Sequence, residues 1–200
     1  YYTNASLNVI LPRHLLSSWD WGTTNIHKES MTHATDFDSV QGFTYQKIAE
    51  DYDIIFNDDG AGEVADLVAV RHTADHIVVD LYHCKYCSSG HQPGARVNDA
   101  YVVAGQASRS AKWLHKGPEL FQRLLNRYSN DQERLLKGTP QKIDFLRLKS
   151  RDVEMRMGFF IVQPAFSVHE VTDSVMTVLG TSYMYLRDIA DVDIRVIASP

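Results

Sequence analysis

YDIIFNDDGAGEVADLVAVRHTADHIVVDLYHCKYC, residues 52–87, is the stretch that decides the predicted fold. Runs rich in β-branched and aromatic residues occupy 52–57, 64–71 and 76–86, and the turn-forming sequences NDDGAG and HTAD separate them. Connections this short favour antiparallel hairpins. The stretch therefore predicts three neighbouring strands of one sheet.

Helical patterns flank these strands. Apolar residues at helical spacing predict a helix at 36–50, with Asp36 as its N-cap, and a longer one at 96–116. Further elements are expected in the second half: helices at 119–128, 130–137, 168–179 and 183–189, a strand at 153–163 ended by Pro164, and a closing strand at 194–198. The order of elements indicates an α/β (α+β) fold with helices around a central mixed sheet.

Length and composition predict one domain spanning residues 1–200, since a chain of this size and 44% hydrophobic content can build a sizeable core. The net charge of −5 argues against a general coat for polyanions but leaves room for a local basic face. Without a signal segment or a membrane-spanning apolar run, we expect a soluble, cytoplasmic protein with no membrane partner. A start at Tyr1 rather than at Met suggests a domain excised from a larger protein.

Two charged residues stand out in these apolar strands. Asp66 lies on the middle strand and Lys85 on the last, and burying either is costly unless it is paired, hydrogen-bonded or bound to metal. Because alternate residues of a strand share a face, His83 is predicted to point the same way as Lys85. A carboxylate, an imidazole and an ammonium group around one point suit metal-assisted hydrolysis of a phosphodiester.

With these residues, the chain resembles the PD-(D/E)xK nuclease superfamily over roughly residues 36–116. That family places an Asp on one strand and an acid two residues before a Lys on the next; Asp66 and Lys85 match, and His83 stands where the family has the acid. The resemblance implies a restriction-endonuclease-like fold, an Mg²⁺ or Mn²⁺ ion, and cleavage of DNA. An imidazole in place of a carboxylate suits softer metals than magnesium, so tolerance of manganese is expected.

The resemblance also implies further site residues. Glu50 is the candidate for the family's helix acid and a second metal ligand beside Asp66, and Gln41 is the other polar residue of that helix that could face inward. Gln106, on the helix after the lysine strand, would touch the site or substrate. Arg109 and Lys112 would contact phosphates.

The string DLYHCKY followed by GQA resembles nuclease domains fused to or partnered with helicases in bacterial anti-phage defence. It implies a helicase domain or subunit as partner. Because cleavage of both DNA strands commonly needs two sites, a homodimer is a further expectation.

Three other interpretations stay open. Asp66 and Lys85 could form a buried structural ion pair, and His83 could be a half-buried histidine with no catalytic part, so that an inactive nuclease-like fold binds only nucleic acid or a partner protein. Cys84, Cys87 and His91 give a partial zinc spacing, although no second cysteine pair completes it. Glu63 favours a turn-capping role over that of a metal ligand.

Overall fold

Three apolar runs of the decisive stretch pair as antiparallel strands in the computed structural model, which describes residues 9–200. The strands are β2 (Ile54–Asn57), β3 (Leu67–His72) and β4 (His76–Cys84), with Val70 opposite both Ile54 and Val79. The two predicted hairpins are therefore confirmed.

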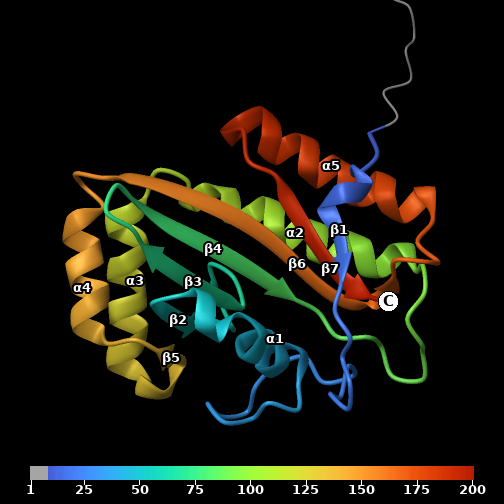
Figure 1. Ribbon diagram of the computed structural model, residues 1–200, viewed down its shortest axis with the longest axis horizontal. Coiled ribbons are helices and arrows are strands. Elements are labelled where there is room, and N and C mark those ends of the chain that lie inside the picture. The colour runs from blue at the N-terminus through green and yellow to red at the C-terminus, as the bar shows by residue number, and fades with distance from the viewer. Residues whose placement is uncertain (1–8) are drawn as a thin grey trace, which may run out of the picture.

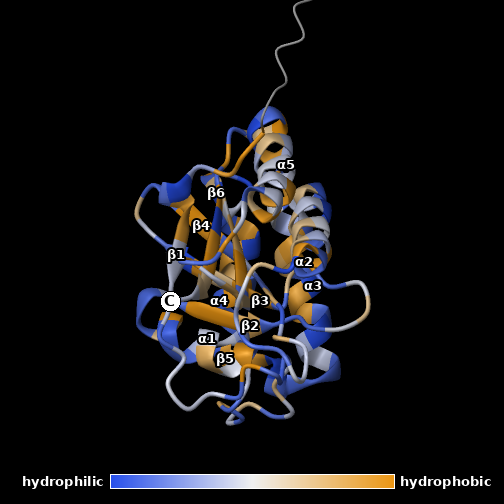
Figure 2. Ribbon diagram, turned by 90° about the vertical axis from the view of Figure 1, so that its right-hand side faces the viewer, coloured by the Kyte–Doolittle hydropathy of each residue, from blue (hydrophilic) through white to orange (hydrophobic). Residues whose placement is uncertain are grey.

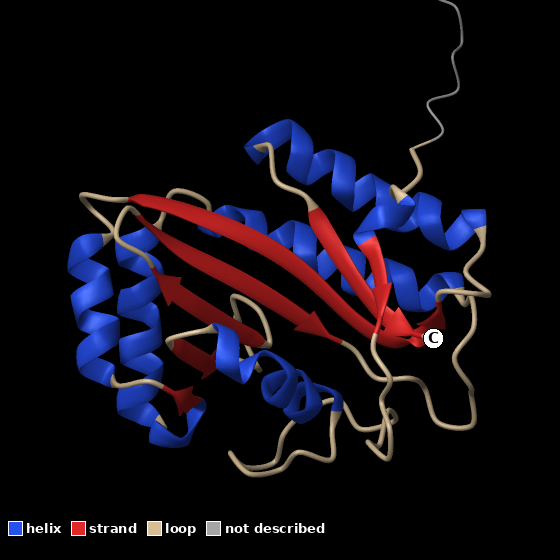
Figure 3. Cartoon of the chain, in the orientation of Figure 1, coloured by secondary structure: helices blue, strands red, loops and turns tan. Residues whose placement is uncertain are grey.

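The rest of the sheet extends from both sides of these strands. On one side β6 (Glu154–Ser167), β7 (Ile194–Ser199) and β1 (Leu16–Ser18) run parallel to β4, and on the other side β5 (Leu135–Lys137) pairs antiparallel with β2. The order is β1-β7-β6-β4-β3-β2-β5 (Figures 1 and 3). Parallel neighbours need long crossovers, which the helices supply. The expectation of a mixed sheet flanked by helices is confirmed.

Within residues 9–200, five α-helices flank the sheet: α1 (Val40–Ile48), α2 (Val97–Ser110), α3 (Gly117–Asn130), α4 (Pro140–Lys149) and α5 (Asp173–Ala190). Among the described residues, none of them has the length and apolar character needed to cross a membrane. The predicted N-cap of α1 is wrong, because Ser39 accepts the hydrogen bond from the Gly42 N–H. Asp36 instead accepts from the Thr32 N–H and pairs with Lys28 in the preceding loop.

The second half of the chain differs from the prediction at four places. Residues 130–137 form a 3-10 turn and β5 rather than a helix, and α4 was not predicted. Pro164 lies within β6, where the pairing with β7 is irregular and a missing N–H is tolerated. The two helices expected at 168–179 and 183–189 are one helix, α5, that passes through Gly180.

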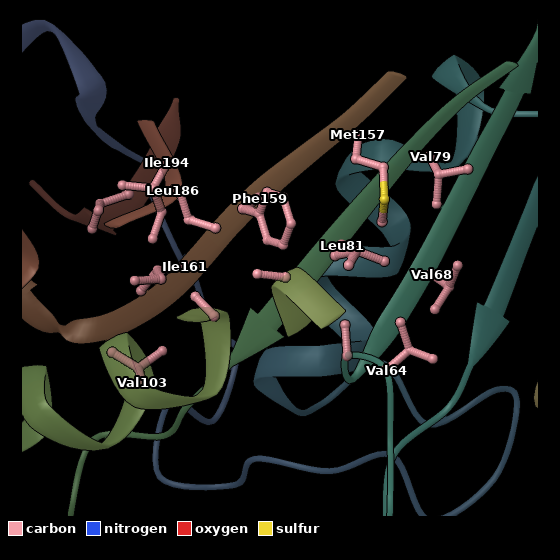
Figure 4. Close-up of a cluster of buried hydrophobic side chains, with 14 of the residues drawn as sticks. Val64, Val68, Val79, Leu81, Val103, Met157, Phe159, Ile161, Leu186 and Ile194 are labelled. Carbon is pink, nitrogen blue, oxygen red and sulfur yellow. The ribbon is translucent and has the colours of Figure 1, made fainter. Parts of the chain in front are cut away.

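Apolar side chains fill both faces of the sheet. The larger cluster lies between the sheet and helices α2 to α5. Figure 4 shows part of it, with Val68, Leu81 and Phe159 on three adjacent strands and Val103 of α2 beside Ile161 of β6. A smaller cluster on the other face lies under α1. Hydrophobic sequence is concentrated in the strands and hydrophilic sequence in the loops (Figure 2). Apolar packing on both faces thus holds the start of β3 and the end of β4 in place. The candidate site lies at these two strand ends.

Candidate active site

Three carboxylates gather where the β2–β3 loop enters β3. One oxygen from each of Asp59, Glu63 and Asp66 lies within 4.8 Å of the other two; Asp66 is buried and the other two are half-buried. Carboxylate oxygens are the ligands that Mg²⁺ and Mn²⁺ prefer. This acidic cluster has the donors to hold a divalent metal ion.

Asp66 is fixed in place by two hydrogen bonds. Its Oδ2 accepts from the Cys84 N–H of β4 at 2.8 Å, and its Oδ1 accepts from Nε2 of Gln41 at 3.1 Å. Burial raises the pKa of Asp66 well above its usual value, the Cys84 N–H opposes that shift, and the negative charges of Glu63 and Asp59 add to it. A cation at the cluster would relieve both the desolvation and the repulsion.

Gln41 links two members of the cluster. It is fully buried in the first turn of α1, where its Nε2 also donates to Asp59 Oδ2 at 2.9 Å and its Oε1 accepts from the Met31 N–H at 3.1 Å. The inward position considered for Gln41 is confirmed. Glu50 is exposed just beyond the other end of α1. A rise of 1.5 Å per residue places it about 13 Å from Gln41 along the helix axis. The structure therefore does not bring Glu50 to the acidic cluster.

Glu63 has two roles in the structure. Its Oε2 accepts from the Gly60 N–H at 2.9 Å, as expected of a residue that caps a turn. It also belongs to the acidic cluster, although its spacing from Asp66 argued against a shared face. The alternation rule fails here because residues 58–66 form an irregular loop rather than a strand.

His83 lies at the floor of a cavity next to this cluster. It is 1% exposed, and neither ring nitrogen has a hydrogen-bond partner among the described residues. Burial, followed by the positive charge of Arg109, lowers the pKa of His83 to about 3, so its ring is neutral at neutral pH. The cavity, of about 350 Å³, is also lined by Glu63, Gln106 and Lys112. His83 thus carries two buried, unpartnered ring nitrogens at the wall of a space bounded by both acidic and basic groups.

Three other predicted site residues lie at the same cavity. Gln106 of α2 has a buried Oε1 without a partner in the described part of the chain, and Arg109 and Lys112 are exposed on the cavity wall. Neither cation forms an ion pair with a described residue. By contrast, Arg123 and Arg127 of α3 both pair with the buried Asp58 and thereby hold the loop that carries the cluster.

Lys85 is held by an acid that sequence reasoning missed. Its Nζ lies 2.6 Å from Oε2 of Glu29, which also accepts from the Tyr86 N–H at 3.3 Å. Lys85 does not line the cavity of His83, whereas its partner Glu29 adds to the raised pKa of Asp66. The grouping of Lys85, His83 and Asp66 around one point stays a prediction. The alternative of an Asp66–Lys85 ion pair is wrong, because the ion-pair partner of Lys85 is Glu29. Glu29 lies in a loop without periodic pattern, so no sequence signal marked it.

The cysteines do not form a zinc site with His91. The Cys84 thiol donates to Thr44 Oγ1. The Cys87 sulfur accepts from Arg96 Nη2, and its hydrogen bond to His91 goes to the backbone oxygen rather than to the imidazole ring. Within residues 9–200, the acidic cluster is the one group of three or more His, Cys, Asp or Glu side chains close enough to hold a metal ion. The zinc interpretation therefore lacks a ligand set in this part of the chain.

The chain matches no family model, no curated protein and no solved structure. The functional argument therefore comes from the site itself.

Proposed function

We propose that this protein is a metal-dependent nuclease domain that hydrolyses phosphodiester bonds of DNA. The observation that carries the proposal is the acidic cluster of Asp59, Glu63 and Asp66 beside a cavity walled by two cations without ion-pair partners among the described residues, Arg109 and Lys112. The carboxylates suit a divalent metal and the cations suit phosphate oxygens. Helix α1 followed by the antiparallel strands β2, β3 and β4 supports the likeness to the PD-(D/E)xK arrangement.

The residues divide the work between metal binding and orientation. Asp59, Glu63 and Asp66 would hold Mg²⁺ or Mn²⁺, and Gln41 orients two of those carboxylates through its amide. When bound, such an ion acidifies a water molecule and polarises a phosphate oxygen. Three carboxylates supply the negative charge that His83 does not, so the site does not need a carboxylate at position 83.

The neutral ring of His83 can accept a hydrogen bond from a water molecule in the cavity and orient it toward phosphorus. Arg109 and Lys112 would hold the phosphate, and Gln106 offers an acceptor beside it. Lys85, fixed by Glu29, contributes positive charge from the end of β4. The group that orients the water molecule and the groups that stabilise the phosphate charge would thus lie on different sides of the site.

Cleavage of labelled single- and double-stranded DNA by the purified chain, with Mg²⁺ or Mn²⁺, tests the proposal. We expect metal-dependent cleavage that Asp66→Ala and Lys85→Ala each abolish while remaining folded by circular dichroism. Undiminished cleavage by folded Asp66→Ala would rule out the proposed mechanism.

A second candidate is an inactive nuclease-like fold that binds nucleic acid or a partner protein. The engagement of Lys85 by Glu29 and the imidazole at position 83 favour it. A purified chain that binds DNA but cuts it with neither metal would decide for this candidate. The anti-phage setting, the helicase partner and the homodimer remain proposals that rest on the sequence resemblance.

A further inference from the structure

A second cavity, of about 1010 Å³, is lined from both faces of the sheet, and part of its lining belongs to the face opposite His83. The strand register places two rows of side chains on this face. In one row Arg71 of β3 lies opposite Val78 of β4, which lies opposite Arg156 of β6. In the other, Tyr82, Phe160 and Arg195 lie side by side on β4, β6 and β7. Directly opposed residues of adjacent strands share a face, so three arginines surround one area of the sheet.

Two of these arginines are free to bind an anion. The guanidinium of Arg71 lies 5.9 Å from the ring centre of Tyr52, and that of Arg195 lies 5.6 Å from the ring centre of Phe160. Both side chains are exposed, and neither forms an ion pair with a residue in 9–200. Stacking on an aromatic ring fixes a guanidinium without neutralising its charge.

Three acidic residues at the border of this cavity are engaged in ion pairs. Glu154 pairs with Arg156 at 2.9 Å, and Asp191 and Asp193 share Arg187 at 2.9 and 3.3 Å. The charges of Arg71 and Arg195 are therefore not cancelled by these neighbours. Arg71 and Arg195 are thus cations in a cavity whose lining also includes carboxylates.

Asp80 lies between the two free arginines as a recessed hydrogen-bond acceptor. It is 8% exposed; its Oδ2 accepts from the Tyr52 hydroxyl at 2.6 Å, whereas its Oδ1 has no partner among the described residues. Oδ1 lies over Gly158, at the place where a side-chain Cβ would be. Burial raises the pKa of Asp80, and the Tyr52 hydroxyl, Arg71 and Arg195 oppose that shift. The cavity thus offers an acceptor at its floor and cations on two sides.

We infer that this face binds single-stranded nucleic acid, with phosphates at Arg71 and Arg195 and the amino group of a base donating to Asp80. A base must be unpaired for its edge to reach a recessed carboxylate, which favours a single strand over a duplex. Cytosine N4 is a suitable donor for such an acceptor. The inference does not depend on the proposed cleavage, because it involves other residues on the other face of the sheet.

Fluorescence anisotropy with labelled oligodeoxycytidine, over a salt series and with EDTA to prevent cleavage, tests this inference. Each phosphate contact contributes about 0.7 to the slope of log K against log salt concentration for single strands. We expect Arg71→Gln and Arg195→Gln each to lower the slope by about 0.7. Arg13→Gln, which removes an exposed arginine of the 3-10 turn Arg13–Leu15, should leave it unchanged.

Asp80→Asn supplies a readout that loss of stability alone would not give. The asparagine side chain would still accept from Tyr52 through its oxygen and would present an amino donor to the cavity. Binding should therefore shift from oligodeoxycytidine toward oligodeoxythymidine, whose bases offer acceptors.

Two results would overturn the inference. One is no binding of either oligonucleotide by the wild-type chain. The other is a slope that Arg109→Gln lowers while Arg71→Gln and Arg195→Gln leave it unchanged, since the strand would then lie at the His83 cavity. Neither result depends on whether the chain cleaves DNA, so the outcome for the proposed nuclease activity is separate.

Discussion

Lys85 Nζ lies 2.6 Å from Glu29 Oε2, so the lysine at the end of β4 is positioned by a residue of the long N-terminal loop. The negative charge of Glu29 also contributes to the raised pKa of Asp66, after burial and the charges of Glu63 and Asp59. Glu29 therefore links this loop to two residues of the candidate site, Lys85 and Asp66.

Glu29→Gln should lower the rate of cleavage more than it lowers stability. The partly exposed Lys85–Glu29 pair is worth about 1 kcal/mol or less, whereas loss of lysine positioning should slow the chemical step about tenfold. Single-turnover cleavage and thermal melting measure the two effects. Asp144→Asn, which breaks an ion pair with Arg147 in α4, is the matched control and should leave the cleavage rate unchanged.

Divalent metal should stabilise the folded chain through the acidic cluster. Mn²⁺ at a hundredfold excess over its dissociation constant would add about 2.7 kcal/mol to the free energy of unfolding. Asp59→Asn and Glu63→Gln should each weaken this effect, whereas Glu50→Gln should retain it because Glu50 is exposed away from the cluster. Differential scanning fluorimetry over a Mn²⁺ series gives the comparison. A metal-dependent shift lost in Glu50→Gln but kept in Glu63→Gln would contradict this assignment.

His83 should make the protein sensitive to mild acid. The pKa of His83 is about 3 in the fold against 6.5 ordinarily, so between these values the unfolded chain binds a proton that the folded chain does not. The stability that its neutral ring contributes is complete above pH 6.5 and is lost as pH falls, by up to about 1.4 kcal/mol per pH unit. Urea unfolding of wild type and His83→Leu from neutral pH downward measures the difference. Parallel pH profiles for the two proteins would mean that His83 is not buried as a neutral ring.

Gly180 should tolerate no side chain, although it lies within a helix. A Cβ there would lie 2.5 Å from the Val9 carbonyl oxygen and 2.8 Å from the Leu11 nitrogen, both of them backbone atoms. We expect Gly180→Ala to cost about 1–3 kcal/mol, as overpacking usually does. Gly105→Ala in α2 has open space and should instead stabilise by up to about 1 kcal/mol through helix propensity. Thermal melting should shift in opposite directions for the two variants.

Local sequence pattern predicted the elements whose residues obey one regular period. Strands β2, β3 and β4 alternate or are continuously apolar between clear turns, and the structure confirms them. The predicted helices at 168–179 and 183–189 leave out Gly180, whereas the structure places it inside α5, packed against the backbone of residues 9–11. Thr139 and Pro140 carry the cap and first-turn signals of α4, which were present in the sequence and missed.

The candidate site was only partly predictable for a related reason. Asp66 and Gln41 lie in or beside regular elements, and their inward positions follow from period and polarity. Asp59, Glu63 and Glu29 come from loops, whose side-chain directions are set by tertiary contacts such as the clamp of Arg127 on Asp58. The hydrophobic periodicity of the sequence therefore does not predict where the side chains of such loop residues point.

The rate of DNA cleavage as Mn²⁺ is titrated, compared between wild type and Asp66→Asn, tests the central claim most directly. We predict that the wild-type rate saturates at the same Mn²⁺ concentration that half-completes the thermal shift, and that Asp66→Asn loses at least about a hundredfold in rate while remaining folded. Cleavage by folded Asp66→Asn at the wild-type rate, or no cleavage by wild type at any Mn²⁺ concentration, would contradict a metal-dependent nuclease centred on Asp66.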